Sequence, residues 1–244
     1  IRLRPGPPRS HSRTMSDRLH PRENPDLVGH EHAEREIIDA WTSGRLHHAW
    51  LISGPKGIGK ATLAYRFARF VLAGGGDSSP DGGDALFGDA EMPAILNSLA
   101  IDAEHPVFRR VAASGHGDLQ VIERGMSDDG KRMQSVIPVE KIRSVGHTMS
   151  LTAGEGGWRV IIVDGAEEMN PNAANALLKV LEEPPPRALL LLITHAPGRL
   201  LPTIRSRCCQ LRLSGLAPDL VDGLVAQHRP DLSAEDRGVL ARLS

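Results

Sequence analysis

The residues best suited to chemistry form a glycine-rich stretch, Gly54-Pro55-Lys56-Gly57-Ile58-Gly59-Lys60. It follows a short apolar run, Ala49–Ser53, and precedes Lys60–Leu72, where apolar residues recur at helical spacing. A strand, a glycine-rich loop and a helix in this order form the context that a phosphate-binding loop requires, and they disfavour a plain turn with a chance lysine. Backbone N–H groups of such a loop converge on phosphate oxygens, while the lysine reaches the outer phosphates. The sequence therefore predicts a nucleotide site at Gly54, Gly57, Ile58, Gly59 and Lys60.

The predicted site lacks the hydroxyl group that normally binds Mg²⁺. The phosphate-loop pattern places Ser or Thr after the lysine, because its hydroxyl binds Mg²⁺, but this chain has Ala61 there and Thr62 one residue later. One residue turns a helix by about 100°, so Thr62 is poorly placed to substitute. We expect binding of ATP or ADP around Ala61 and Thr62, with weakened binding of Mg²⁺.

A second acidic motif lies further along the chain. The apolar run Val160–Val163 ends on Asp164, which a parallel sheet would deliver to the edge where Mg²⁺ binds in phosphate-loop proteins. The next residue is Gly165, where ATPases of this broad class usually carry a glutamate that polarises the attacking water. Glu167 and Glu168 come later, in a turn or at a helix start. The sequence therefore predicts nucleotide binding without hydrolysis. The alternative is an active ATPase in which Glu167 and the displaced threonine replace the missing groups.

The rest of the pattern indicates an α/β fold. Buried-strand patterns alternate with helical periodicity, which predicts a parallel sheet covered by helices on both faces. Glycine clusters between residues 73 and 117 predict a flexible excursion with a short helix near Pro93–Ala100. The other expected strands are Leu119–Glu123, Val160–Asp164, Ala188–Thr194 and one that begins at Arg207 after a Pro202–Arg205 turn. The other expected helices are His30–Ser43, Val139–Ser150, Asn172–Glu182, Pro218–Gln227 and Ala234–Leu243.

These elements divide the chain into three predicted regions. We expect residues 1–23 to be a disordered arm or an upstream extension, because residues 1–14 are rich in arginine and proline and Met15 offers a start directly after them. The prolines argue against the amphipathic helix of a transit peptide. Residues 24–214 are predicted to form the nucleotide-binding domain, and residues 215–244 the beginning of a small helical domain that stops at Ser244.

Composition narrows the class of protein. The chain has 244 residues, of which 40% are hydrophobic and 24% charged, and a formal net charge of -1. Its apolar runs are far shorter than the roughly 20 residues that span a bilayer, so we expect no membrane segment. A near-neutral chain is not an electrostatic partner for DNA, so any DNA contact must come from a local patch or a partner protein. The adjacent pair Cys208-Cys209 favours a reducing, cytoplasmic setting.

A resemblance appears at the segment from Asn172 through Leu177-Leu178-Lys179-Val180-Leu181-Glu182-Glu183-Pro184-Pro185 and at Ser206-Arg207-Cys208. These residues closely resemble the clamp-loader subunits of bacterial DNA polymerase III, and the similarity runs from Leu27 to Leu213. The resemblance implies an AAA+ domain with a helical lid, in a hetero-oligomer of gamma/tau, delta and delta-prime subunits. That complex places a sliding clamp on primed DNA. A helicase loader or a kinase would not share these motifs.

Within that family, Ala61 and Gly165 resemble the delta-prime subunits, whose ATPase motifs are often decayed. The resemblance implies that Arg207 reaches the ATP site of a neighbouring subunit and that Thr194 matches the sensor of the terminal phosphate. A surface salt bridge is the alternative for Arg207, and a gamma/tau-like motor subunit is the alternative for the chain. The family often has a four-cysteine zinc module after the loop helix, but Ala73–Gly117 contains no cysteine, so we expect no zinc and no other metal site. The expected role is that of a non-catalytic or weakly active subunit of a nucleotidyltransferase complex.

Overall fold

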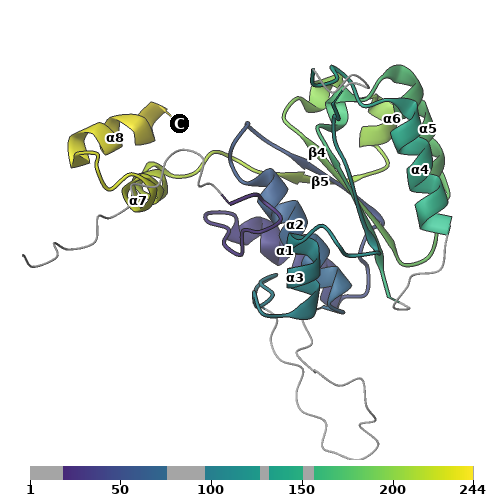
Figure 1. The fold of residues 1–244 in the computed structure, drawn as a ribbon, viewed down its shortest axis with the longest axis horizontal. Helices are drawn as coiled ribbons and strands as arrows, with labels where there is room; N and C mark the ends of the chain where they lie inside the picture. The colour runs from purple at the N-terminus through teal and green to yellow at the C-terminus, as the bar shows by residue number, and fades with distance from the viewer. Residues whose placement is uncertain (1–18, 76–96, 127–131, 151–156, 244) are drawn as a thin grey trace, which may run out of the picture.

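The fold is built on a parallel sheet (Figure 1). The structure, a computed structural model, describes residues 19–75, 97–126, 132–150 and 157–243. Five strands pair in the order β2-β3-β4-β1-β5, and every neighbouring pair is parallel. The strands are β1 (Ala49–Ser53), β2 (Leu119–Ile122), β3 (Arg159–Asp164), β4 (Ala188–Thr194) and β5 (Cys209–Arg212).

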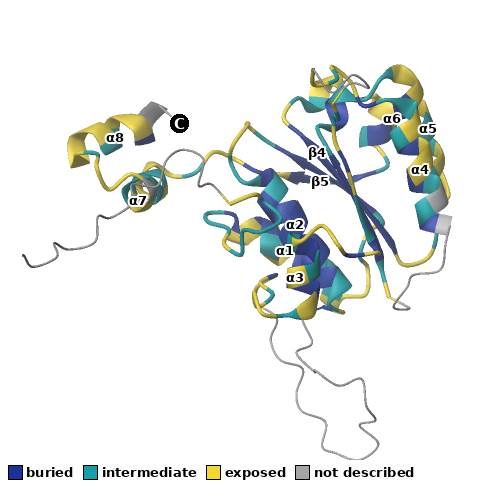
Figure 2. Ribbon diagram, viewed as in Figure 1, coloured by how far each residue is buried: buried dark blue, intermediate teal, exposed yellow. Residues whose placement is uncertain are grey.

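Helices cover both faces of the sheet (Figure 1). Because successive strand residues face opposite sides, Trp50 and Ile52 pack into one core cluster, whereas Ala49 and Leu51 pack into the other. The first cluster lies under α1 (Glu31–Thr42), α2 (Lys60–Leu72) and α3 (Pro106–Ala112), and the second under α4 (Val139–Ser150), α5 (Pro171–Glu182) and the short α6 (Pro202–Arg205). All residues of β1 and β4 are buried, which explains why their sequences are continuously apolar up to their last residues (Figure 2).

The predicted α/β architecture is confirmed. The bounds predicted for β1, β4, α2, α4 and α8 (Ala234–Leu243) agree with the structure. The other predicted helices and strands differ by one residue at one or both ends, except that the strand expected to begin at Arg207 begins at Cys209. The short helix α3 was not predicted. Of the helix expected near Pro93–Ala100, residues 93–96 lie outside the described residues, and residues 97–100 are not helical, so that helix is wrong where it can be compared.

Two helices, α7 (Pro218–His228) and α8, lie apart from the sheet and its covering helices (Figure 1). They pack on each other, with Arg237 Nε 3.4 Å from Asp222 Oδ1. Leu216, just before α7, lies close to Gly29, just before α1: a Cβ atom on Gly29 would lie 2.6 Å from Leu216 Cδ2. A boundary near residue 215 remains our proposal for the division into domains.

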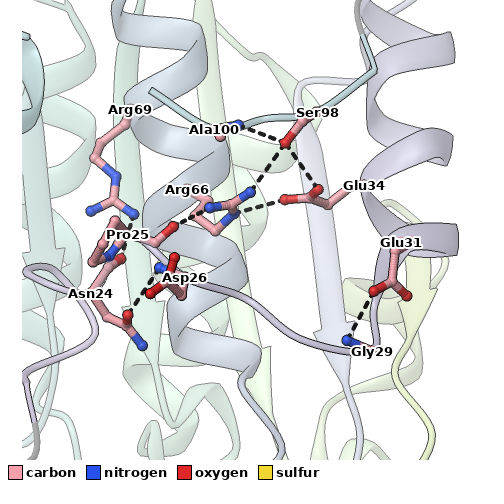
Figure 3. Close-up of polar contacts among 10 residues, drawn as sticks. All are labelled: Asn24, Pro25, Asp26, Gly29, Glu31, Glu34, Arg66, Arg69, Ser98 and Ala100. Carbon is pink, nitrogen blue, oxygen red and sulfur yellow. Dashed lines mark hydrogen bonds and ion pairs between the residues drawn. The ribbon is translucent and has the colours of Figure 1, made fainter. Parts of the chain in front are cut away.

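Two buried arginines on α2 hold the segment that leads into α1 (Figure 3). Arg66 Nε lies 2.7 Å from Glu34 Oε1 on α1, and Nη1 donates to the carbonyl oxygen of Pro25. Arg69 donates to the carbonyl oxygens of Arg22, at 3.0 Å, and Asn24, at 2.9 Å. Burial, and then the neighbouring Arg66, lower the pKa of Arg69 to about 10. Residues 22–26 are thereby fixed against the helix that follows the glycine-rich loop.

Candidate nucleotide-binding site

The glycine-rich loop connects the end of β1 to the start of α2, as the sequence predicted. Gly57 and Gly59 have φ angles of +88° and +101°, a region that L-residues with a side chain rarely adopt. A Cβ atom on Gly57 would meet nothing within 4 Å, so this side of the loop is open. The open loop at the N-terminus of a 13-residue helix fits the phosphates of a nucleotide.

Lys60 lies within the loop, as a phosphate-binding lysine should. Its side chain is largely buried, and Nζ donates to the carbonyl oxygens of Gly54, at 2.8 Å, and Pro55, at 2.5 Å. Burial lowers the pKa of Lys60, while the carboxylates of Asp164 and Glu167 act in the opposite direction. The ammonium group is therefore held at the loop, beside two acidic side chains.

Residues 27–30 pack against the glycine-rich loop at Ile58 and Gly59. The sequence did not predict this contact. His30 is buried, and its Nε2 donates to the carbonyl oxygen of Ile58 at 2.5 Å. A Cβ atom on Gly59 would lie 3.1 Å from Leu27 Cδ1 and 3.6 Å from His30 Cδ2. A side chain at position 59 would therefore push the loop away from this segment.

The strand register brings the other predicted residues to the same edge of the sheet. Ser53, which precedes the loop, pairs with Thr194, and Asp164 pairs with the preceding residue, Ile193. Burial raises the pKa of Asp164, the nearby Glu123 raises it further, and Lys60 opposes this. Asp164 and Thr194 thus lie at the carboxyl edge beside the loop, where ligands bind in open parallel sheets.

The position expected to carry the Mg²⁺-binding hydroxyl has none. Ala61 is the second residue of α2 and is partly buried, while Thr62, one residue further along the helix, is only 9% exposed. Gly165, the position of the expected water-activating glutamate, has a φ of +75°, and a Cβ atom there would lie 2.6 Å from Glu168 Oε2. The backbone after Asp164 therefore disfavours any side chain at position 165.

Neither later glutamate is free to take that place. Glu168 Oε2 forms an ion pair of 2.7 Å with Arg124 Nε. Glu167 is fully buried and accepts hydrogen bonds from the backbone N–H of His195, at 3.1 Å, and from its Nδ1, at 2.6 Å. Burial raises the pKa of Glu167, but hydrogen bonds from Thr194 and His195 outweigh it, so that the pKa is lowered. Glu167 is therefore a buried carboxylate bound to the residues that end β4.

Arg207 lies at the opposite edge of the sheet from the loop. It precedes β5, whose first residue, Cys209, pairs with Trp50 near the start of β1. Its guanidinium donates to the carbonyl oxygen of Thr203 at 3.0 Å, and Nη2 lies 3.0 Å from Glu182 Oε1 at the end of α5. The side chain of Arg207 is 37% exposed. Arg207 and Glu182 therefore form a surface ion pair. Arg207 lies at the edge of the sheet where the strands begin, away from the glycine-rich loop at the other edge.

Comparison with known proteins identifies the family. The sequence profile of the family described as "DNA polymerase III, delta subunit" matches residues 96–217, half of the chain. The chain belongs to this family. It is 37% identical over 199 residues to DNA polymerase III subunit delta' of Pseudomonas aeruginosa, covering 81% of this chain and 52% of that protein. It is 32% identical over 183 residues to subunit delta' of Escherichia coli, covering 75% of this chain and 46% of that protein.

This delta-family chain is also similar to the gamma subunit of DNA polymerase III from Buchnera aphidicola, with 26% identity over 207 residues, 84% of this chain and 48% of that protein. It therefore spans about half the length of these curated relatives. A variant of Thermotoga maritima RuvB has the same fold, with a TM-score of 0.51 and 14% identity over 91% of this chain and 60% of that one. The AAA+ fold predicted for this family member is thus confirmed.

Two histidines between residues 73 and 117 have local structural roles in this member of the delta family. His105 caps α3 by accepting the Val107 N–H, and His116 accepts the Asp118 N–H. Across residues 19–75, 97–126, 132–150 and 157–243, no cluster of three or more side chains is suited to a metal ion. No helix within those ranges is both long and apolar enough to cross a bilayer. The expected lack of zinc remains a prediction.

Proposed function

We propose that the chain is the nucleotide-binding part of a delta-prime-like subunit of the DNA polymerase III clamp loader, which helps to place the sliding clamp on primed DNA. In this proposal residues 24–214 form the AAA+ domain, residues 215–244 begin the lid, and residues 1–23 form an arm. The partners are gamma/tau and delta subunits in a cytoplasmic hetero-oligomer. Membership of the DNA polymerase III delta family and the AAA+ fold support this assignment.

The observation that carries the proposal is a phosphate loop without the groups that hydrolysis needs. Gly57, Gly59 and Lys60 have the geometry to hold ATP or ADP. Ala61 supplies no hydroxyl for Mg²⁺, and the backbone at Gly165 disfavours a side chain in the position of the water-activating glutamate. The subunit therefore binds nucleotide weakly and acts through its interfaces.

A hydrolysis assay on the purified chain tests this part of the proposal. Phosphate release in the presence of ATP and Mg²⁺ should be no faster for the parent than for Lys60→Ala. Nucleotide binding should be weaker in Lys60→Ala than in the parent. Magnesium-dependent turnover that disappears with Lys60→Ala would instead identify a gamma/tau-like motor subunit, in which Thr62 and Glu167 supply the missing groups.

We propose that Arg207 acts in trans. Its position at the amino edge of the sheet separates it from its own loop, and its side chain is partly exposed on the surface. An arginine from a neighbouring subunit can stabilise charge on the transferring phosphoryl group, by roughly 10³–10⁵-fold in rate in the best cases. The planar, permanently charged guanidinium is suited to this role. The ion pair with Glu182 is exposed and contributes about 0–1 kcal/mol, so it is readily exchanged for a phosphate.

A reconstituted loader that contains full-length subunits tests the role of Arg207. Arg207→Ala should leave assembly intact and reduce ATP hydrolysis stimulated by clamp and DNA, whereas Arg199→Ala, at another exposed position, should leave it unchanged. Other subunits keep their own arginines, so the loss in the bulk rate is partial. Site-resolved, pre-steady-state measurements give the clearer result. A loader with Arg207→Ala that hydrolyses ATP and loads clamps like the parent would reduce Arg207 to a surface ion pair.

A further inference from the structure

Glu167 is a buried carboxylate at the end of β4, on the edge of the sheet that carries the glycine-rich loop. Its side chain has no exposure to solvent. Oε1 takes the two contacts with His195, while Oε2 is buried and has no hydrogen-bond partner in the part of the chain that the structure describes. Buried carboxylates are normally satisfied at both oxygens, so this one retains an unsatisfied negative charge.

That charge acts on the two residues of the site that respond to phosphate and metal. The hydrogen bond from the His195 N–H holds Glu167 at the end of β4, the strand whose Thr194 and Ile193 pair with Ser53 and Asp164. From there its carboxylate favours the ammonium form of Lys60 and raises the pKa of Asp164. Glu167 also lies beside Thr194, which lowers the pKa of Glu167 and which pairs with Ser53 directly before the loop.

We propose that Glu167 makes the site selective for a nucleoside diphosphate over a triphosphate. The inference rests on the proposed binding of nucleotide at the glycine-rich loop. A phosphate-loop lysine reaches the β- and γ-phosphates, so the γ-phosphate of a triphosphate would lie on the side of Lys60 where Asp164 and Glu167 lie. It would bring further negative charge toward the buried carboxylate of Glu167. A diphosphate ends before this region and does not meet this repulsion.

The predicted effect is a change in the ratio of two dissociation constants. At the effective dielectric of a protein site, a charge close to a phosphate alters affinity by about tenfold. Glu167→Gln keeps the shape of the side chain and an oxygen that accepts the His195 N–H, but removes the charge. Glu168→Gln is the matched control, because the adjacent residue pairs with Arg124.

The experiment measures binding of a fluorescent ADP and of the corresponding non-hydrolysable ATP analogue to the parent chain and both variants. Parent protein should prefer the diphosphate, Glu167→Gln should lower the ratio of triphosphate to diphosphate dissociation constants about tenfold, and Glu168→Gln should change it less than about twofold. A ratio in Glu167→Gln equal to that of the parent would overturn the inference. If Lys60→Ala binds both nucleotides as well as the parent does, the loop itself is not the binding site, and the proposed function fails separately.

A second variant covers the case in which Glu167→Gln does not fold, as judged by thermal unfolding. His195 is an exposed residue whose imidazole donates to the carboxylate, so His195→Ala leaves the charge in place and less compensated. The preference for the diphosphate should then increase. An unchanged or smaller preference in folded His195→Ala would contradict the role assigned to Glu167.

Discussion

Replacement of Arg66 by methionine should destabilise the folded domain strongly, although the residue does not contact the glycine-rich loop. The side chains of Arg66 and Glu34 are only 7% and 12% exposed, and Nε lies 2.7 Å from Oε1. Arg66 also donates to Ser98 Oγ at 3.3 Å and to the carbonyl oxygen of Pro25 (Figure 3). The substitution removes all three contacts and leaves a buried carboxylate whose remaining partner is the Ser98 hydroxyl, at 3.4 Å.

The magnitude follows from that residual charge. Removing one partner of a buried ion pair costs about 3–5 kcal/mol, a large part of a typical stability of about 5–15 kcal/mol. Glu34→Gln keeps an acceptor for Nε and should cost less, about 1–3 kcal/mol. In the double variant no unpaired charge is buried, so the combined cost should fall short of the sum by about 1–3 kcal/mol.

Equilibrium unfolding in urea, followed by tryptophan fluorescence, measures these free energies of unfolding. Arg45→Met is the control, because Arg45 is exposed and its replacement should change stability by less than about 0.5 kcal/mol. The reasoning is refuted if Arg66→Met costs no more than Arg45→Met, or if the two single substitutions simply add. Either result would mean that Arg66 adds little to the stability that packing and the contacts of Arg69 already give residues 22–26.

Three further outcomes are expected. Gly165→Glu, even combined with Ala61→Ser, should not create ATP hydrolysis and should lower the melting temperature, because position 165 has a φ of +75° and its Cβ would lie 2.6 Å from Glu168 Oε2; measurable turnover would contradict this. Burial raises the pKa of Cys208 to about 12, so in a Cys209→Ser background the thiol should stay protonated at pH 8 and react slowly with a disulfide reagent. Its reaction should accelerate on unfolding, where the pKa returns to about 8.5; equal rates in both states would argue against burial. Metal analysis of tag-free protein should show far less than one zinc per chain, and stoichiometric zinc would overturn that expectation.

Much of the fold could be predicted from the sequence because its central strands are buried on both faces. The run Ala188–Thr194 is apolar up to its last residue, and proline residues after α5 mark where that helix ends. The helix α3 escaped prediction because its seven residues are too short for a helical period to stand out, and its start depends on a histidine cap. Order of the strands also required the structure, since residues far apart in sequence pair in the sheet.

The site residues could be predicted only where they form a motif of consecutive residues or end a recognisable strand. The loop pattern predicted Gly54 to Lys60 as nucleotide-binding residues, and the end of a buried strand predicted Asp164. The link between Glu167 and His195 joins positions 28 residues apart, and nothing in the local sequence distinguishes it from a solvated helix start. The arginine network of α2 likewise depends on burial, because an arginine among apolar residues usually predicts an exposed helix position. Tertiary contacts therefore decide which charged residues are buried and paired.

The arrangement of the sheet explains how a subunit could lose its own hydrolysis and still serve a neighbour. In a parallel sheet every strand ends at the edge that carries the loop, and every strand begins at the edge that carries Arg207. The five residues of β1 separate these edges by about 13–17 Å, at roughly 3.3 Å for each residue. Substitutions such as Ala61 and Gly165 thus alter one edge, while Arg207 at the other edge depends on Thr203 and Glu182. If Arg207 acts in trans, decay of the loop leaves its position intact, whereas loss of the sheet that joins the two edges would abolish both.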